Sequence, residues 1–414
     1  MTDMSGFGPV IPPLHEEQRS LRQQVFERVR AAGCLARVEI AKELAISPAS
    51  VTSISAELIA DGLLQEVQQD RDTGRGRPPV AIGVNPDAYL VAGIKVSDLD
   101  HTGVISDFSG RVLVSITRQE RGPFQSKDDL MALIAGLLDD LCRQASLTRK
   151  DLSALGIGMP GFIDHDTGHV IWSPMLRGDG FPLAKEAEAA FGLPTTIDND
   201  ANLATLAELW FGEGRTRKDF AVVTIEHGVG MGMVINHRLY RGARGLGMEL
   251  GHTKVQMDGA LCRCGQRGCL EAYVADYAIK REAETALGGR GAGEGAPTGR
   301  LLDTLFARAK AGEPGARAVF HRAGRFLSLG LSNVVNIFDP ELIILSGARM
   351  QYDLLWADDV LNDMRRMMLD THRRGPDIQV HAGGDLIWAR GAAALAIGHL
   401  SDAVLGTRKE LQVS

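Results

Sequence analysis

The stretch Leu261-Cys-Arg-Cys-Gly-Gln-Arg-Gly-Cys-Leu-Glu271 places three cysteines in one short turn, and Glu249-Leu-Gly-His252 lies just upstream. Thiolates and imidazole are the ligands of closed tetrahedral zinc sites. The expected ligands are His252, Cys262, Cys264 and Cys269. Because protein would fill all four positions, we expect a structural Zn2+ ion and not a catalytic one. The alternative is a mobile loop of reduced cysteines, which the histidine and the tight spacing disfavour.

Composition sets wide bounds on the protein class. The chain has 414 residues, enough for two or three domains. Its formal net charge is -7, so contact with nucleic acid requires a local basic patch. A disulfide framework is not expected, because three of the five cysteines share one turn. With no apolar run of about 20 residues and no secretory signal, the sequence predicts a cytoplasmic protein without membrane contact.

The first part of the chain, about residues 1–86, reads as a small helical domain. Helices are expected at 17–32 and 37–45, and Ser47 before Pro48 is a typical start for a third helix ending near Asp61. Two helices joined by a tight turn predict a helix-turn-helix. A helical bundle used only for dimerisation is the alternative.

A candidate wing follows the third helix. The run Thr73-Gly-Arg-Gly-Arg-Pro-Pro79 separates two short strands, expected at 63–68 and 80–82. Such a slim arginine-bearing tip suits the narrow, electronegative minor groove of A·T-rich DNA. The alternative is a solvated linker.

The candidate DNA contacts are mostly small side chains. Residues 1–80 hold nine Lys and Arg against eleven Asp and Glu, and the third helix has no Lys or Arg. Base-edge or thymine-methyl contacts are therefore expected from the helix, and phosphate or minor-groove contacts from the wing. The predicted contacts are Ser47, Ala49, Ser50, Thr52, Ser53, Arg75, Gly76 and Arg77.

The remainder, residues 87–414, reads as an α/β domain with alternating apolar strands and longer helices. Two halves of similar order predict two lobes around a cleft. The first lobe is expected at about 87–198 plus a C-terminal helix at about 385–402, and the second at about 199–384.

Five sequence motifs occur one after another along residues 156–271. They are Gly156-Ile-Gly-Met-Pro-Gly-Phe-Ile-Asp164, Ile197-Asp-Asn-Asp-Ala-Asn202, Gly228-Val-Gly-Met-Gly232, Glu249-Leu-Gly-His252 and the Cys262 to Glu271 block. The chain resembles the ROK family of repressors, open reading frames and kinases over nearly its whole length. The resemblance implies a winged helix-turn-helix followed by a two-lobed domain of the hexokinase and actin fold. ROK members with such an N-terminal domain are sugar-responsive transcription regulators.

The same resemblance implies a sugar site. Its members on this chain are Asn199, Asp200, Glu249, His252 and Glu271. Zinc would fix the ring orientation of His252, so that its second nitrogen faces the sugar. A plain helix cap is the alternative for Asn199 and Asp200.

The choice between regulator and kinase depends on the phosphate loops. In ROK kinases the counterpart of Asp200 is the general base, and an Asp-x-Gly-Gly-Thr loop approaches the phosphates. This chain has Lys95-Val-Ser-Asp-Leu99 there, His227 in place of a threonine, and one glycine, Gly347, of a usual pair. We therefore expect no enzyme activity and no ATP cofactor. An ATP-dependent sugar kinase with an added DNA-binding domain is the alternative, and a protein-binding scaffold is a third.

The resemblance also implies partners. They are operator DNA, a sugar or polyol effector, and further copies of the chain in a homodimer or homotetramer. Met175 stands where many members carry an asparagine that reads a sugar substituent. The sequence therefore does not identify the sugar.

Overall fold

The computed structural model describes residues 6–11, 19–67, 80–98, 100–119, 124, 126–287, 298–369, 375–381, 384 and 386–406. The chain divides into two compact units, Met1–Arg217 with Leu386–Ser414, and Lys218–Asp385. The predicted wing tip with Arg75, Gly76 and Arg77 lies outside the described residues. Within the described ranges, no helix is long and apolar enough to cross a bilayer.

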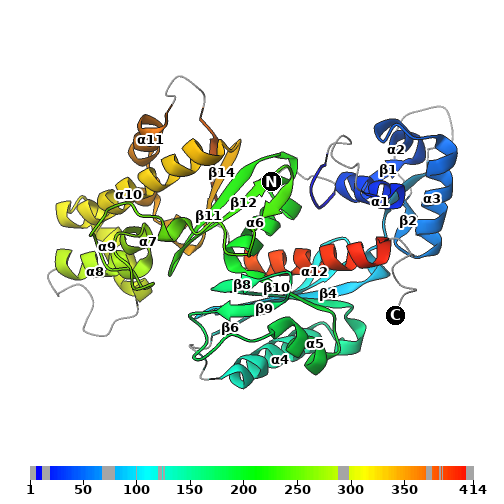
Figure 1. Ribbon diagram of the computed structural model, residues 1–414, viewed down its shortest axis with the longest axis horizontal. Coiled ribbons are helices and arrows are strands. Elements are labelled where there is room, and N and C mark those ends of the chain that lie inside the picture. The colour runs from blue at the N-terminus through cyan, green and yellow to red at the C-terminus, as the bar shows by residue number, and fades with distance from the viewer. Residues whose placement is uncertain are drawn as a thin grey trace. The chain divides into compact units, whose positions relative to one another are not determined.

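The first unit begins with three helices and a small antiparallel sheet (Figure 1). Its elements are α1 (Leu21–Ala32), β1 (Cys34–Ala36), α2 (Arg37–Glu43), α3 (Pro48–Ala60), β2 (Leu64–Val67) and β3 (Ala81–Val84). Ser47 caps α3, because its hydroxyl accepts a hydrogen bond of 3.0 Å from the backbone N–H of Ser50. β3 lies between β1 and β2, so a winged helix-turn-helix fold is present. The sequence pattern did not indicate β1.

A five-stranded sheet forms the rest of the first unit, in the order β10-β7-β4-β5-β6. Its strands are β4 (Leu90–Lys95), β5 (Asp100–Asp107), β6 (Val112–Gln119), β7 (Ala154–Met159) and β10 (Thr195–Asn199). The helices α4 (Lys127–Gln144) and α5 (Leu183–Phe191) cover one face, and α12 (Ile387–Leu405) covers the other (Figure 1). The hairpin β8 (Phe162–Asp164) and β9 (His169–Trp172) follows β7.

Close packing of α12 explains two glycines of the sheet. A Cβ added at Gly93 would lie 2.3 Å from the carbonyl oxygen of Ala389, and one at Gly156 would lie 2.0 Å from that of Ala392. Both distances are far below van der Waals contact, so only glycine lets the helix approach the strands here. The first glycine of the Gly156 motif therefore serves packing.

The helix α6 (Asp200–Phe211) belongs to the first compact unit, which extends to Arg217. The lobe boundary predicted at about residue 199 remains a sequence-based expectation. Every residue from Ala201 to Trp210 is buried, and a Cβ added at Gly391 of α12 would lie 1.9 Å from the carbonyl oxygen of Leu203. This helix–helix contact keeps α6 with the first unit.

The second unit is built on another five-stranded sheet, in the order β13-β12-β11-β14-β15. Its strands are β11 (Phe220–Ile225), β12 (Val229–Ile235), β13 (Arg238–Tyr240), β14 (Leu342–Ser346) and β15 (Asp377–His381). Its helices are α7 (Glu271–Val274), α8 (Asp276–Ala286), α9 (Thr298–Lys310), α10 (Pro314–Phe338) and α11 (Asp358–Met367). Short 3-10 helices lie at Arg149–Asp151 and Glu213–Thr216 in the first unit and at Leu250–His252, Ala348–Gln351 and Asp353–Leu355 in the second.

Candidate metal centre and ligand site

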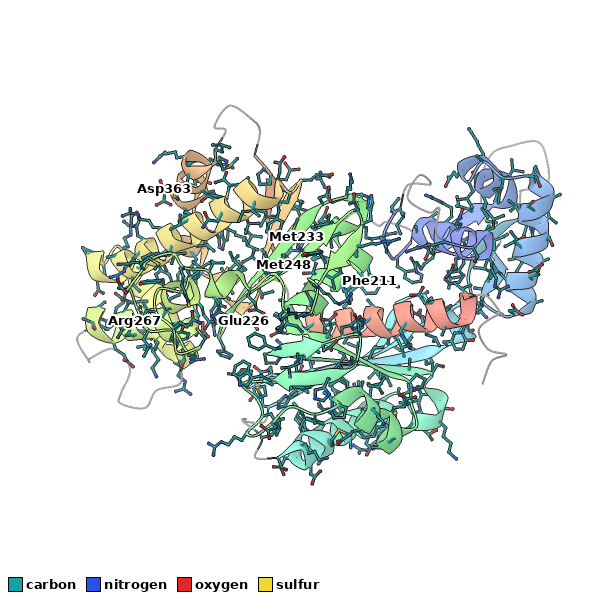
Figure 2. All side chains as sticks on the ribbon, in the orientation of Figure 1. Phe211, Glu226, Met233, Met248, Arg267 and Asp363 are labelled. Atoms are coloured by element: carbon teal, nitrogen blue, oxygen red, sulfur yellow. The ribbon has the colours of Figure 1, made fainter. Side chains whose placement is uncertain are left out.

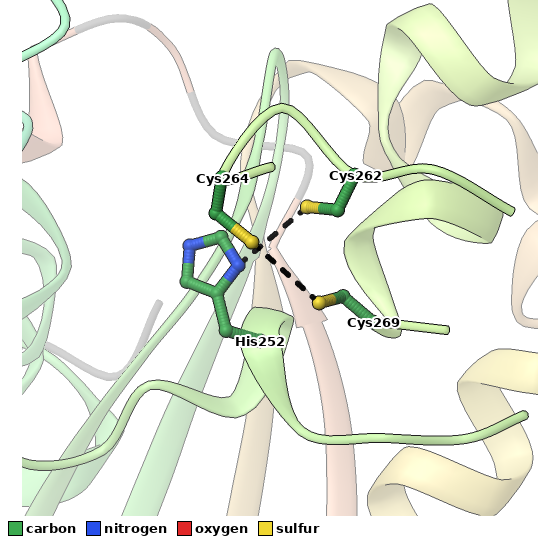
Figure 3. Close-up of side chains that lie close together, drawn as sticks. All are labelled: His252, Cys262, Cys264 and Cys269. Atoms are coloured by element: carbon green, nitrogen blue, oxygen red, sulfur yellow. Dashed lines mark hydrogen bonds between the residues drawn. The ribbon is translucent and has the colours of Figure 1, made fainter. Parts of the chain in front are cut away.

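The second unit brings the four predicted metal ligands together. The ligand atoms of His252, Cys262, Cys264 and Cys269 all lie within 4.8 Å of one another, and their side chains point toward a common centre (Figure 3). The sulfur atoms of Cys264 and Cys269 are 3.7 Å apart, and so are the sulfur of Cys262 and Nδ1 of His252. A tetrahedral ion with bonds of about 2.3 Å separates its sulfur ligands by about 3.8 Å. The cluster therefore has the dimensions of a closed metal site.

Glycines make the tight turn of this loop possible. Gly265 and Gly268 have φ values of +83° and +78°, a region that side chains with a Cβ avoid. A Cβ at Gly268 would also lie 1.8 Å from the carbonyl oxygen of Gln256. The backbone N–H of Cys262 donates to the carbonyl of Gln266 (2.8 Å), which closes the turn around the sulfur atoms.

Two neighbouring side chains interact with the sulfur atoms. The ammonium of Lys254 donates to the sulfur of Cys269 at 2.9 Å, and this bond raises the pKa of Lys254. The hydroxyl of Tyr277 lies 3.5 Å from the sulfur of Cys262. A set of three thiolates and one histidine bound to Zn2+ carries a net charge of −1, so a cation and a hydroxyl donor suit it.

The cluster also fixes the ring of His252. Nδ1 faces the sulfur atoms, so Nε2 is the nitrogen that remains for a ligand. Glu271 is buried beside the cluster, where one carboxylate oxygen accepts from the hydroxyl of Tyr277 (3.3 Å) and the other from the backbone N–H of Val229 (3.3 Å). Glu249 is exposed, and its carbonyl accepts from the backbone N–H of His252 (3.0 Å). Three of the five predicted sugar ligands therefore lie around one loop.

The other two predicted ligands, Asn199 and Asp200, lie where β10 meets α6 in the first unit. The amide oxygen of Asn199 accepts from the backbone N–H of Ala201 (2.8 Å), so Asn199 caps the N-terminus of α6. Its amide nitrogen donates to the carbonyl of Gly161 (2.8 Å). Both bonds hold the side chain of Asn199 in one orientation at the end of the sheet.

The sequence motifs did not single out Asp198 as a supporting residue. Its carboxylate is buried and accepts from the amide of Asn202 and from the backbone N–H of Asn199, each at 2.8 Å. A carboxylate with two such donors stiffens the turn that carries Asn199 and Asp200. Its position inside the Ile197 to Asn202 motif was the available signal.

A family model described as the ROK family matches residues 101–399. This match spans more than half of the chain. The protein belongs to the ROK family.

The ROK relatives include named repressors. A xylose repressor from Caldicellulosiruptor bescii is 31% identical over 317 residues, which is 75% of this chain and 78% of the relative. The DNA-binding transcriptional dual regulator NagC from Escherichia coli (strain K12) is 29% identical over 340 residues, or 81% of each chain.

A solved ROK regulator matches a larger share of this chain than a solved ROK glucokinase does. A ROK family transcriptional regulator, a homolog of the E. coli MLC protein, matches 93% of this chain and 96% of its own, with a TM-score of 0.78 and 26% identity. A ROK family glucokinase from Streptomyces griseus, solved with glucose and AMPPNP, matches 74% of this chain and 99% of its own, with a TM-score of 0.65 and 26% identity.

The glycine loop that binds phosphate in ROK kinases faces protein carboxylates in this chain. Asp276 is buried and pairs with Arg349 at 2.5 and 2.7 Å and with Nδ1 of His227 at 2.9 Å. Burial by itself would raise the pKa of Asp276, but the bonds from His227 and Arg349 outweigh burial and lower it. Glu226 accepts from the backbone N–H of Ala348 at 3.2 Å. Sequence reasoning missed Asp276, Arg349 and Glu226, because none belongs to a glycine motif.

The first ROK loop is folded on itself. The ammonium of Lys95 is buried 3.5 Å from the ring centroid of Trp388. The hydroxyl of Ser97 donates to the carbonyl of Asp100 (2.8 Å) and accepts from its backbone N–H (3.1 Å), while Leu99 lies outside the described residues. Ser97 and Asp100 are therefore held together by two hydrogen bonds in a run that lacks the paired glycines.

Met175, which stands where many ROK members carry an asparagine, belongs to the core of the first lobe. It is 2% exposed, and its carbonyl accepts from the backbone N–H of Phe124 at 2.7 Å. The side chain of Met175 therefore serves packing in this structure.

The winged helix and the first lobe share a buried junction. The guanidinium of Arg30 in α1 lies 4.7 Å from the ring centroid of Trp210 at the end of α6. Arg215 donates to the carbonyls of Gly8 (3.0 Å) and Ala31 (2.7 Å), and the backbone N–H of Gly8 donates to that of Trp210 (2.7 Å). Phe211, labelled in Figure 2, is the last residue of α6. One helix thus runs from Asp200 to this junction.

Proposed function

We propose that this ROK protein is a sugar-responsive transcriptional repressor and not an enzyme. The observation that carries the proposal is the winged-helix fold in front of a ROK domain, matched over 93% of the chain by a regulator and over 74% by a glucokinase. The relatives named xylose repressor and NagC support the same function. In this proposal residues 1–86 bind operator DNA and the ROK domain senses the sugar in a cytoplasmic setting.

The proposed sugar ligands are those named from the sequence, namely Asn199, Asp200, Glu249, His252 and Glu271. Carboxylate and amide oxygens accept hydrogen bonds from neighbouring sugar hydroxyls, and Nε2 of His252 supplies a donor or an acceptor according to its tautomer. Glu271 is already oriented by Val229 and Tyr277. This support lowers the entropy lost when the sugar binds.

The proposed resident metal is a structural Zn2+ ion held by His252, Cys262, Cys264 and Cys269. The donor set of three sulfurs and one nitrogen and its spacing fit this ion better than Mg2+ or Ca2+, which prefer oxygen ligands. When bound, the ion supplies no reaction chemistry, because protein fills its coordination shell. The chain's own residues then hold His252 and Glu271 in place for recognition.

The proposed DNA surface is the exposed side of α3 with its cap. Ser47 and Ser50 share a hydrogen bond of 2.8 Å, and the hydroxyl of Thr52 donates to the carbonyl of Pro48 (2.8 Å). Thr52 therefore offers its methyl group, which suits a thymine methyl. Ala49 and Ser53 are exposed on the same helix. Because these short side chains give modest affinity, we propose a homodimer or homotetramer that engages two half-sites.

An ATP-dependent sugar kinase is the second candidate, favoured by the glucokinase likeness and by Asp200 at the base position. Two features oppose it. The Lys95 to Leu99 run lacks the paired glycines. The carboxylate of Glu226, which lies beside the second glycine loop, would repel phosphate oxygens.

The proposal predicts that a sugar stabilises the protein without being phosphorylated. At a sugar concentration of 100 times Kd, we expect about 2.7 kcal/mol of added stability. The measurement is a thermal-shift screen with D-xylose, D-glucose, N-acetyl-D-glucosamine, xylitol and D-glucitol. A coupled assay of ADP release with each sugar and ATP runs beside it. ADP release that Asp200→Asn abolishes would replace the repressor-only function with the kinase.

The wing predicts a sequence-dependent loss of DNA binding. The double substitution Arg75→Ala and Arg77→Ala should weaken binding to A·T-rich sites about tenfold more than to G·C-rich sites, because a narrow minor groove has the stronger negative potential. Fluorescence anisotropy with matched duplexes at several salt concentrations measures this. Arg143→Ala, an exposed position on α4, is the control. Equal losses on all duplexes, with the salt slope reduced by about 2, would identify plain phosphate contacts instead.

A further inference from the structure

The hairpin of β8 and β9 carries a large aromatic side chain where solvent can reach it. Trp172 is 51% exposed, and its ring centroid lies 5.4 Å from that of Phe162 on the opposite strand. Among the described residues, Trp210 and Trp388 are buried. Trp172 is thus exposed and Phe162 is half-buried beneath it. Tryptophan and other aromatic side chains are enriched at binding interfaces, so this pair is a candidate contact surface.

A bulge in the hairpin turns Trp172 outward. Phe162 pairs with Trp172 and Ile163 pairs with Val170, so Ile171 is an extra residue in β9. Ile163 and Val170 are buried in the core of the lobe. In a regular strand without a bulge, residues 170 and 172 would face the same side, so Trp172 would point into that core with Val170. With it, Trp172 joins Phe162 on the outer face, as expected of bulges that re-aim a side chain.

This aromatic pair is connected to the proposed sugar site through Gly161. The carbonyl of Gly161 accepts from the amide of Asn199 (2.8 Å). A Cβ at Gly161 would lie 2.2 Å from the carbonyl oxygen of Trp172, and the φ of Gly161 is +129°. The peptide that orients Asn199 is therefore packed against the backbone of Trp172. Phe162 is the next residue in the chain.

We propose that Trp172 and Phe162 form a stacking platform for the C–H face of a closed-ring sugar whose hydroxyls are bound by Asn199 and Asp200 of the same unit. Rigid sugar rings present C–H groups with partial positive charge, which the negative face of an aromatic ring attracts. Pockets that combine aromatic walls with a few polar groups are typical of small-molecule sites. An acyclic polyol has no such rigid face, so the platform selects pyranoses over polyols. This inference rests on the proposed sugar-sensing function and narrows its ligand class.

The test compares matched ring and acyclic ligands by isothermal titration calorimetry with the full-length protein. D-Xylose is paired with xylitol, and D-glucose with D-glucitol, with N-acetyl-D-glucosamine as a further ring sugar. For the ring sugar that binds, Trp172→Ala should lower the affinity about tenfold, whereas Trp172→Phe should retain most of it. Affinity for the matching polyol should change less than about twofold. Ile171→Ala, at the exposed bulge position, is the control.

Fluorescence gives an independent readout of the same contact. Acrylamide should quench the emission of Trp172 in the free protein, and the ring sugar should protect it. Sugar binding that Trp172→Ala leaves unchanged, or a wild-type preference for the polyol, overturns the platform and leaves the sensing function intact. A change of oligomeric state in Trp172→Ala would assign this face to a second copy of the chain instead. Failure of all five ligands to bind the wild type overturns the sensing function and the platform together.

Discussion

Replacing Cys264 with serine is expected to remove stable zinc binding and to weaken sugar binding about 10- to 100-fold. Cys264 is exposed, so the substitution removes a metal ligand with little loss of packing. Without the ion, the metal–ligand bonds no longer hold the turn from Cys262 to Cys269 together. His252 and Glu271 then lose their fixed orientation. Metal content by mass spectrometry, sugar affinity by calorimetry and the unfolding temperature are the three measurements.

Cys34→Ser is the matched control, because Cys34 lies in β1 of the winged helix and does not belong to the metal-ligand cluster. It should keep one zinc ion per chain and an unchanged sugar affinity. If the Cys264→Ser protein binds sugar as tightly as the wild type while holding no metal, zinc does not orient His252. If Cys264→Ser and Cys34→Ser lower the unfolding temperature equally, the loss of stability comes from replacing a cysteine at either position and not from the loss of the metal.

Replacing Asp276 with alanine is expected to lower the free energy of unfolding of the second unit by about 3–5 kcal/mol. The change leaves the guanidinium of Arg349, whose side chain is 11% exposed, without its two bonds to the Asp276 carboxylate. It also removes the carboxylate from Nδ1 of His227. Differential scanning calorimetry measures the loss. Asp363→Ala is the control, because Asp363 on α11 pairs only at the surface with Arg366 (Figure 2).

The carboxylate of Asp276 also makes the free energy of unfolding depend on pH. The folded pKa of Asp276 is lower than its usual value, so the stabilisation is complete above the unfolded pKa of about 3.9. As pH falls below that value toward the folded pKa, the carboxylate takes up a proton only at a cost to the folded state, and the stabilisation is lost. The Asp276→Asn protein should lack this part of the acid sensitivity. Equal slopes of stability against pH in both proteins would contradict the assignment.

Local sequence signals predicted the elements well where a single motif determines them. Ser47 and Pro48 mark the start of α3 because capping and proline geometry act within one turn. The grouping of His252 with the three cysteines was predictable for a similar reason, since the three thiols are separated by a few residues only.

Features that depend on distant packing were not predictable. The packing of α6 against α12, almost 200 residues later in the chain, is one such feature. The role of Gly156 in letting α12 approach β7 has the same origin. Arg349 and Asp276 are 73 residues apart in the sequence, and no sequence motif or spacing indicates that these two residues form an ion pair. The bulge at Ile171 depends on strand pairing, which the pattern of residue types alone does not reveal.

The course of α6 has a thermodynamic consequence for the proposed repressor. Its 12 residues form a rod about 18 Å long, with Asp200 at one end and Trp210 against Arg30 of α1 at the other. If this rod carries the signal from sugar to winged helix, linkage requires the reverse as well. Operator DNA must then change the affinity for sugar by the same factor by which sugar changes the affinity for DNA. A repressor already seated on its operator would thus respond to a different sugar concentration from one free in solution.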